Sequence, residues 1–428
     1  MSCFSTIAAN IPGQFTGKAP KASFWLFQTE DNSSEYPIEE LNWACGAERA
    51  DSSGADILSS SLGYATFNDA SLDHSYADMN GNTTMAAIAA DLAAKKGMLV
   101  FLANGNSGTS TWHYLITPAD GDSVIAVGAV SSSGAVGNFS SYGPSSDGQV
   151  KPDVASVGVS AVIQTAGGGI GLSNGTSFAC PNMAGLGTCL WQGFPELGNM
   201  KIRNALWQSG SIANAPDDRI GYGIPNMKTA FGILLKEFST ANAAITNCTA
   251  ALTWMSKDVS TMKYEIERKA PGDTSYMKIA DIPAQANISI LTTHTYAKTD
   301  LLEDMQTGSY SYRVKQVIDT NAASFVAVYI DTVNVSFTGS CVTTTLKIVP
   351  NPVETNQISL KVGTDNSVQN LNILFFDMLG QRVFQFSGSK PAGTSRFDFP
   401  IGRLAKGKYV VAVYDGKKLL TSKGFVKL

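Results

Sequence analysis

The change of sequence pattern near residue 240 constrains the fold of this chain more than any other feature. Before it, apolar β-type runs alternate with helical stretches, as a parallel sheet covered by helices requires. We expect this α/β part to span residues 1–237. Its buried strands are predicted at residues 22–28, 56–62, 98–103 and 123–130, and its helices at 37–50, 84–96, 200–208 and up to 235–236. Asn82 and Thr83 are the candidate caps of the Ala-rich helix at 84–96.

After residue 240, apolar and polar residues alternate and no helical period is present. Strands at such spacing form a β-sandwich, which we expect at residues 238–338. A Thr/Ser-rich linker follows at residues 336–345, and a second all-β module at 345–428. The predicted fold is therefore α/β, with a parallel sheet flanked by helices, followed by two all-β sandwich modules.

Charge and cysteine content exclude several classes of function. The net charge is -4, and no cluster of Lys and Arg is interleaved with aromatics as nucleic-acid binding requires. No apolar run approaches the roughly 20 residues of a membrane span. The six cysteines form no CxxC pair, so a thiolate metal site has little support. Cys180 and Cys189 lie too far apart on one predicted helix to form a disulfide. Cys248 and Cys341 could form a disulfide or remain free thiols.

A serine that follows a glycine turn is the first candidate for chemistry. Ser177 comes directly after Gly175-Thr176 and before a helix of small residues. Amides at a helix N-terminus favour developing negative charge, and we expect Pro181 to lie in the first turn, where its missing amide costs nothing. Ser177 is thus a candidate nucleophile, although Gly-Thr-Ser is also a common turn and cap.

Two strand ends complete the candidate site. Asn106 lies in the glycine-rich loop after the strand at 98–103, where its amide can face an oxyanion. The segment Ser61-Leu62-Gly63 leaves the strand at 56–62, and its edge can pair with an extended peptide. The loop of Asn106 could instead be an ordinary turn, and the segment 61–63 could simply be where the chain leaves the sheet. The decisive point is that all three elements should lie on one rim of the sheet.

Residues 1–236 resemble the catalytic domain of subtilisin-like (subtilase) serine proteases. The resemblance rests on Gly175-Thr176-Ser177 with Ala179 and Pro181, and on the similar segments 123–129, 139–144 and 151–155. It implies that Ser177 is the nucleophile, that its own amide and Asn106 bind the oxyanion, and that the substrate is held by Ser61, Leu62 and Gly63 and by a pocket wall of Ala103, Asn104 and Gly105.

The same resemblance implies that the acid and base of the triad lie elsewhere. In this family the chain order is Asp, His, Ser. Residues 5–9 resemble the helix after the family's His-Gly-Thr, which would put the His two residues before Met1 and the Asp earlier still. We expect His74 to be a solvated loop residue, His113 a packing residue and His294 part of the β-sandwich. The chain alone should be nearly inactive, because loss of triad members costs subtilisin about 10⁶ in kcat.

No cofactor is expected, with one alternative left open. The polar loop at residues 73–82 contains Asp73 and Asp78 and could offer oxygens to calcium, which several subtilases bind. Its spacing does not match an EF-hand, and an ordinary helix-capping loop explains it equally well.

The two β modules resemble known modules and predict where the protein goes. The first, with Trp254 on an early strand, resembles a fibronectin type III domain, which we interpret as a rigid connector. The second resembles the C-terminal sorting domain of the type IX secretion system of Bacteroidetes, on residues 346–352, 376–383 and 404–411. The start of the chain shows no secretory signal, which alone suggests a cytoplasmic protein. The sorting motifs outweigh the cytoplasmic interpretation, because they imply that the type IX machinery exports the protein to the cell surface or secretes it.

Together these features predict a secreted serine endopeptidase that acts on peptide or protein substrates. The alternative is a non-catalytic secreted pseudo-protease, or a surface protein whose fibronectin-like module binds a partner.

Overall fold

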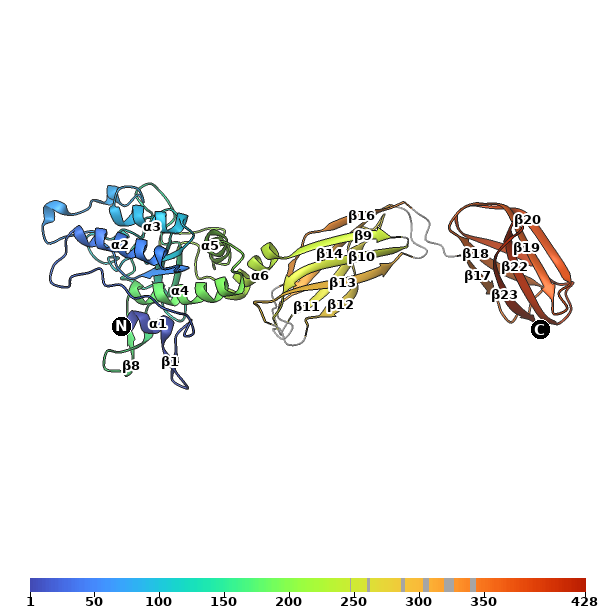
Figure 1. The fold of residues 1–428 in the computed structure, drawn as a ribbon, viewed down its shortest axis with the longest axis horizontal. Helices are drawn as coiled ribbons and strands as arrows, with labels where there is room; N and C mark the ends of the chain where they lie inside the picture. The colour runs from blue at the N-terminus through green and yellow to red at the C-terminus, as the bar shows by residue number, and fades with distance from the viewer. Residues whose placement is uncertain (247, 260–261, 286–288, 303–307, 319–326, 339–343) are drawn as a thin grey trace.

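The computed structural model describes residues 1–428 except 247, 260–261, 286–288, 303–307, 319–326 and 339–343. Figure 1 shows three parts that follow one another: an α/β part, a middle β module and a C-terminal β module. The predicted fold class is confirmed in this arrangement. Part of the predicted linker, including Cys341, lies outside the described residues, and Cys248 is a free thiol.

A four-stranded parallel sheet forms the centre of the α/β part. Its strands lie in the order β3 (Ile57–Ser60), β4 (Leu99–Ala103), β5 (Ile125–Val130) and β6 (Val154–Val157). Three of the predicted strands are therefore confirmed. The strand predicted at 22–28 is wrong, because this segment pairs with no strand of the described chain and exposes Trp25 and Leu26 to 63% and 68%.

Helices cover both faces of this sheet, as the apolar strands require. Val100 and Leu102 of β4 pack in one buried cluster with α2 (Ile38–Ser52) and α3 (Met85–Lys95). Leu99 and Phe101 of the same strand pack in the other cluster with α4, α5 and α6. These three helices span Thr176–Gly193, Asn199–Gln208 and Met227–Phe238. Successive side chains of this strand thus point to opposite faces of the sheet and pack against the helices there.

Smaller elements surround this sheet. Thr84 caps α3 by accepting from the amide of Ala87, so the predicted caps Asn82 and Thr83 are wrong by one or two residues. The remaining elements of the α/β part are α1 (Ser2–Ala8), β1 (Asn10–Ile11), β2 (Phe15–Thr16), η1 (Ala70–Leu72), η2 (Tyr76–Asp78), β7 (Ala161–Gln164) and β8 (Ile170–Ser173).

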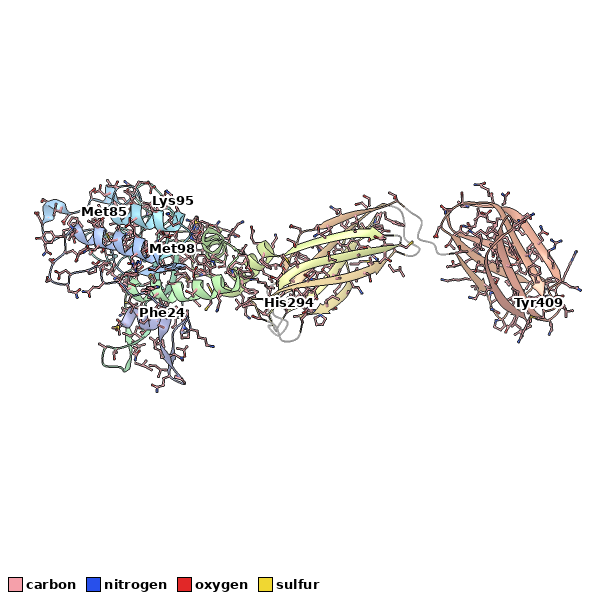
Figure 2. All side chains as sticks on the ribbon, viewed as in Figure 1. Phe24, Met85, Lys95, Met98, His294 and Tyr409 are labelled. Atoms are coloured by element: carbon pink, nitrogen blue, oxygen red, sulfur yellow. The ribbon has the colours of Figure 1, made fainter. Side chains whose placement is uncertain are left out.

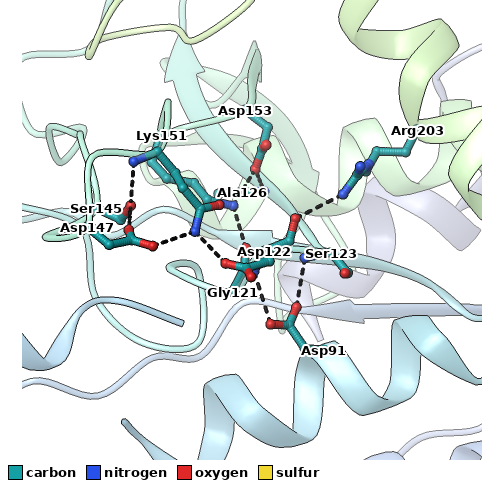
Figure 3. A network of polar contacts seen from close by, with 11 residues as sticks. Asp91, Gly121, Asp122, Ser123, Ala126, Ser145, Asp147, Lys151, Asp153 and Arg203 are labelled. Atoms are coloured by element: carbon teal, nitrogen blue, oxygen red, sulfur yellow. Dashed lines mark hydrogen bonds and ion pairs between the residues drawn. The ribbon is translucent and has the colours of Figure 1, made fainter. Parts of the chain in front are cut away.

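A buried polar network fixes the start of β5 (Figure 3). The Lys151 ammonium pairs with the Asp153 carboxylate at 2.9 Å and donates to the carbonyl of Gly121 at 2.7 Å. Asp153 in turn accepts from the amide of Ala126, and Asp91 of α3 from the amide of Ser123. Because both charges are almost fully buried, each needs the other, and removing one would leave a buried charge unpaired.

The middle module is built of two antiparallel sheets and joins the α/β part through a shared core. One sheet holds β9, β10 and β13, and the other β11, β12, β14, β15 and β16. Lys257, fully buried on β10, donates to the carbonyl of Gly193 and pairs with Glu196, both near the end of α4. The strands span Thr240–Thr246, Thr249–Lys257, Lys263–Lys269, Met277–Pro283, Thr293–Leu301, Gly308–Val317, Ala327–Tyr329 and Val333–Phe337. This arrangement is compatible with a fibronectin-like module, which stays a prediction.

The C-terminal module has its own core between two antiparallel sheets. The sheets are β17-β18-β21 and β20-β19-β22-β23, and every residue of the buried cluster between them comes from Leu346 onward. Their strands span Thr345–Val349, Gln357–Thr364, Val368–Asp377, Arg382–Lys390, Gly393–Pro400, Gly407–Asp415 and Lys418–Lys427. The Lys427 ammonium anchors the last strand by donating to the carbonyls of Ile401 and Leu404.

Candidate active site

The candidate nucleophile lies at the start of a long helix. Gly175, the cap of α4, has φ +152° and ψ +147°, a conformation that is essentially restricted to glycine. Ser177 follows as the second helical residue, half-buried, and its amide is one of the first in the helix that have no partner within it. The glycine turn therefore presents both the hydroxyl and a free amide at one point.

The side chain of Asn106 is oriented by Thr176. Its Oδ1 accepts from the amide of Thr176 at 2.9 Å and from the Thr176 hydroxyl at 3.0 Å. Because the oxygen is occupied, the NH₂ group of Asn106 is left to point elsewhere, and no partner for it is recorded in the described part of the chain. An amide donor next to the start of α4 is what stabilisation of an oxyanion requires.

Pro181 explains a contact between the candidate nucleophile and the predicted substrate-pairing segment that the sequence did not suggest. It lies inside α4, not in the first turn as predicted. A proline has no N–H, so the carbonyl four residues earlier, that of Ser177, loses its helical donor. The hydroxyl of Ser61 donates to this carbonyl at 2.8 Å and replaces the missing bond.

One open cavity of about 540 Å³ brings these elements together. Seven of the eight predicted site residues line it: Ser61, Leu62, Gly63, Ala103, Gly105, Asn106 and Ser177. Asn104 does not line it. Its side chain is fully buried and donates to the carbonyl of Ser141, so its predicted contact with substrate stays a prediction.

The three histidines of the chain are all engaged away from this cavity. The ring of His74 contacts the buried Glu40 carboxylate at 2.6 Å, so the prediction of a solvated residue is wrong. The Glu40 hydrogen bond raises the pKa of His74 above its ordinary value of 6.5, and burial opposes that shift. His113 stacks on Tyr142 with ring centres 3.9 Å apart, as expected for a packing residue. Figure 2 labels His294 on the middle module, where it contacts Gln285.

Residues that the sequence did not single out form the acidic wall of the cavity. Glu30, Glu35 and Glu39 line it, and their carboxylate oxygens lie within 4.8 Å of one another. The only sequence pattern that could have indicated this acidic wall is the presence of acidic residues just before and inside the first turn of the helix predicted at 37–50. That signal is ambiguous, because acidic residues there are common for reasons of helix stability alone.

The carboxylates of the loop at 73–82 bind backbone amides. Asp73 accepts from the amide of Phe67 at 2.7 Å, and Asp78 from the amide and hydroxyl of Ser75. These contacts are those of a capping loop. The open alternative of calcium at this loop gains no support from them.

Comparison with known proteins settles the family. The model of the subtilase family matches residues 1–223, about half of the chain. The chain belongs to the subtilase family. Within it, Subtilisin NAT of Bacillus subtilis subsp. natto is 33% identical over 219 residues, which cover 50% of each protein. Subtilisin DY of Bacillus licheniformis is 31% identical over 216 residues, which cover 50% of this chain and 70% of the relative.

This subtilase spans about half the length of several of its curated relatives. Among solved structures, the self-cleaved protease domain of PatA is similar with 26% identity and a TM-score of 0.45, over 54% of this chain and 82% of that one.

The end of the chain shows where the protein goes. A secretion system C-terminal sorting domain matches residues 347–427. The protein is therefore exported, as a secreted or cell-surface protein. Within the described residues, no helix has both the length and the apolar character that a membrane crossing demands.

Proposed function

We propose that this subtilase is a serine endopeptidase whose nucleophile is Ser177. The observation that carries the proposal is the single cavity in which the Ser177 hydroxyl, Asn106 and the Ser61–Gly63 edge meet. In the reaction, Ser177 Oγ attacks the carbonyl carbon of a peptide bond, and its proton passes by way of a base to the leaving amine. Water then releases the acyl group.

The oxyanion of the tetrahedral intermediate is held by two donors. They are the amide of Ser177, at the positive end of α4, and the NH₂ group of Asn106, which Thr176 orients. An extended substrate pairs with the backbone of Ser61 to Gly63, and the wall of Ala103 to Gly105 receives a substrate side chain.

The lining residues of the cavity include no histidine that could act as the base, and the acid of the triad is likewise unassigned. None of the three histidines lines the cavity, and no described residue forms a hydrogen bond to Ser177 Oγ. A serine without an adjacent base is a weak nucleophile. We therefore expect residues 1–428 by themselves to be poor catalysts, and the non-catalytic surface protein is the alternative that this observation favours.

A chimaera tests the proposal. The segment of Subtilisin NAT that bears the family's Asp and His is joined in front of residue 1, and both this chimaera and the 428-residue chain are treated with a fluorophosphonate. We expect the chimaera to be labelled at Ser177, as located by mass spectrometry, and the chain alone to be labelled weakly. Ser177→Ala is the control that must abolish the label.

The oxyanion assignment is tested in the same chimaera. Asn106→Ala should lower kcat with little change in KM, because the contact forms only as charge develops on the carbonyl oxygen. The expected loss is about 10² to 10³ in kcat, the range found for the corresponding kind of asparagine in subtilisin. An unchanged kcat, or a label on another serine, would show that the site is assigned wrongly.

A further inference from the structure

The acidic wall of the active-site cavity is held in place by its neighbours. We use this name for Glu30, Glu35 and Glu39, which share the cavity with Ser177. The Tyr64 hydroxyl, buried beneath the wall, donates to Glu30 at 2.8 Å, and the amide of Asp31 donates to Glu39 at 2.8 Å. The wall is thus positioned before any ligand arrives.

The negative charge of the wall is not neutralised. No Lys, Arg or His of the described residues forms an ion pair with any of its three carboxylates. Glu39 lies in the first turn of α2, where the helix dipole favours a carboxylate. Burial raises the pKa of Glu35, and the neighbouring charges of Glu39 and Glu30 and a hydrogen bond with the Glu39 side chain raise it further.

One carboxylate oxygen of the wall has no backbone or side-chain N–H or O–H donor among the described residues. The Glu39 side chain is only 2% exposed, and its Oε2 has no hydrogen-bond partner in the described part of the chain. Leaving such an oxygen unpaired in the interior is costly, and more so for an ion. Glu39 lines the cavity and its Oε2 is covered from solvent, so a donor in the cavity reaches this oxygen after a small shift of the side chains around it.

We propose that the acidic wall binds the side chain of a lysine or arginine of the substrate, so that the protease prefers basic peptides. This inference rests on the proposed function. A guanidinium or ammonium supplies positive charge and several N–H donors, and each donor needs only one acceptor. Calcium instead takes six to eight oxygen ligands at about 2.3 to 2.6 Å. One oxygen each of Glu30 and Glu39 is already hydrogen-bonded, which favours the basic side chain over the ion.

Peptide binding to the 428-residue chain tests this without any need for catalysis. Fluorescein-labelled hexapeptides of alanine carry arginine at each position in turn, and matched peptides carry citrulline, which has the same shape and no charge. Fluorescence anisotropy in EDTA should show that arginine at one position binds about ten-fold more tightly than citrulline. Equal binding of the two peptides at every position, or no binding of either, would overturn the proposal.

Variants assign the preference to the wall. Glu39→Gln should reduce the ratio between arginine and citrulline peptides to near one, and Glu35→Gln, at a less buried position, should do the same if the first variant fails to fold. Glu48→Gln, on an exposed part of the same helix α2, is the matched control and should keep the full ratio. If Glu35→Gln and Glu39→Gln, both folded, keep the ratio, the wall is not the binding site.

Two further outcomes distinguish the basic-peptide proposal from a calcium site and from the proposed function. Calcium binding by the chain in isothermal titration calorimetry, lost in Glu39→Gln, with no preference for arginine, would replace the proposal by a cation site. Labelling of Ser177 in the chimaera with no preference for arginine would refute the basic specificity and leave the proposed function standing.

Discussion

The hydrogen bond from Ser61 to the carbonyl of Ser177 joins two motifs that are 116 residues apart in the sequence. Pro181 creates the need for it, since the carbonyl of Ser177 has no helical donor. The residue proposed to pair with substrate therefore also holds the proposed nucleophile in place. We regard Ser61 as a positioning residue for Ser177, acting through the backbone.

Ser61→Ala should loosen the start of α4 without removing any group that touches the scissile bond. We expect about 1 kcal/mol less stability and a several-fold loss in kcat in the chimaera, because a half-buried carbonyl is left without its donor. Ser61→Thr keeps the hydroxyl and should rescue kcat. The measurements are kcat and KM with a fluorogenic peptide, and an equal loss in Ser61→Thr would argue against the hydrogen bond as the cause.

His74 makes stability depend on pH through its contact with Glu40. The pKa of His74 is raised in the folded protein, so the contact stabilises fully below the unfolded value of about 6.5. As pH rises through the raised pKa, the imidazolium loses its proton and the contribution is lost. His74→Gln removes the titration and should flatten the dependence of the melting temperature on pH in this window. A variant that follows the same pH curve as the wild type would exclude His74 as its source.

At the level of elements, sequence predicted what depends on local pattern and missed what depends on a partner. The strands β4 and β5 and the helix α3 follow from runs of apolar residues and alanine, which are local signals. Residues 22–28 carry an equally good β pattern, yet no neighbouring strand in the described chain pairs with them. Propensity cannot supply that partner.

The candidate site shows the same division. That Ser177, Asn106 and Ser61 meet at one cavity could be predicted, because each stands in a motif at the end of a strand or the start of a helix. The acidic wall could not, because its carboxylates meet only through the path of the chain between Glu30 and Glu39, which has no periodic pattern. Likewise, the bond that compensates Pro181 depends on a long-range contact.

The close packing of α4 on the sheet gives a prediction in which two effects oppose each other. Alanine in place of a glycine inside a helix is normally stabilising by about 1 kcal/mol. At Gly187, however, a Cβ would lie 2.5 Å from the Phe101 ring of β4, which is fully buried. Because that ring has no room to move, we expect Gly187→Ala to destabilise the protein by about 1 to 3 kcal/mol.

Denaturant unfolding followed by tryptophan fluorescence measures this effect. Gly167→Ala is the control, because nothing lies within 4 Å of the Cβ that it adds. A Gly187→Ala variant as stable as this control would show that helix and sheet can separate without cost.

On the scale of the whole molecule, the α/β part and the middle module behave as one body and the C-terminal module as another. One buried cluster runs from β4 through α6 into β10 and β14. Lys257 of the middle module also contacts Gly193 and Glu196 of the α/β part. The C-terminal core draws only on residues from Leu346 onward. We therefore expect two thermal transitions, of which the sorting domain accounts for one.

Removal of residues 346–428 should separate folding from export. The remaining chain keeps its whole buried cluster, so its calorimetric transition should stay within about 2 °C of the corresponding transition of the full chain, as expected when no stabilising contact is lost.

The sorting domain matched at 347–427 is what marks the protein for export, so the shortened protein should accumulate in the periplasm of its host. Immunoblots of periplasm, outer membrane and medium measure this, with the exposed substitution Lys417→Ala as a control that keeps the domain. Normal export of the shortened protein would show that the signal lies elsewhere in the chain, and a large fall in its melting temperature would show that the two bodies stabilise each other.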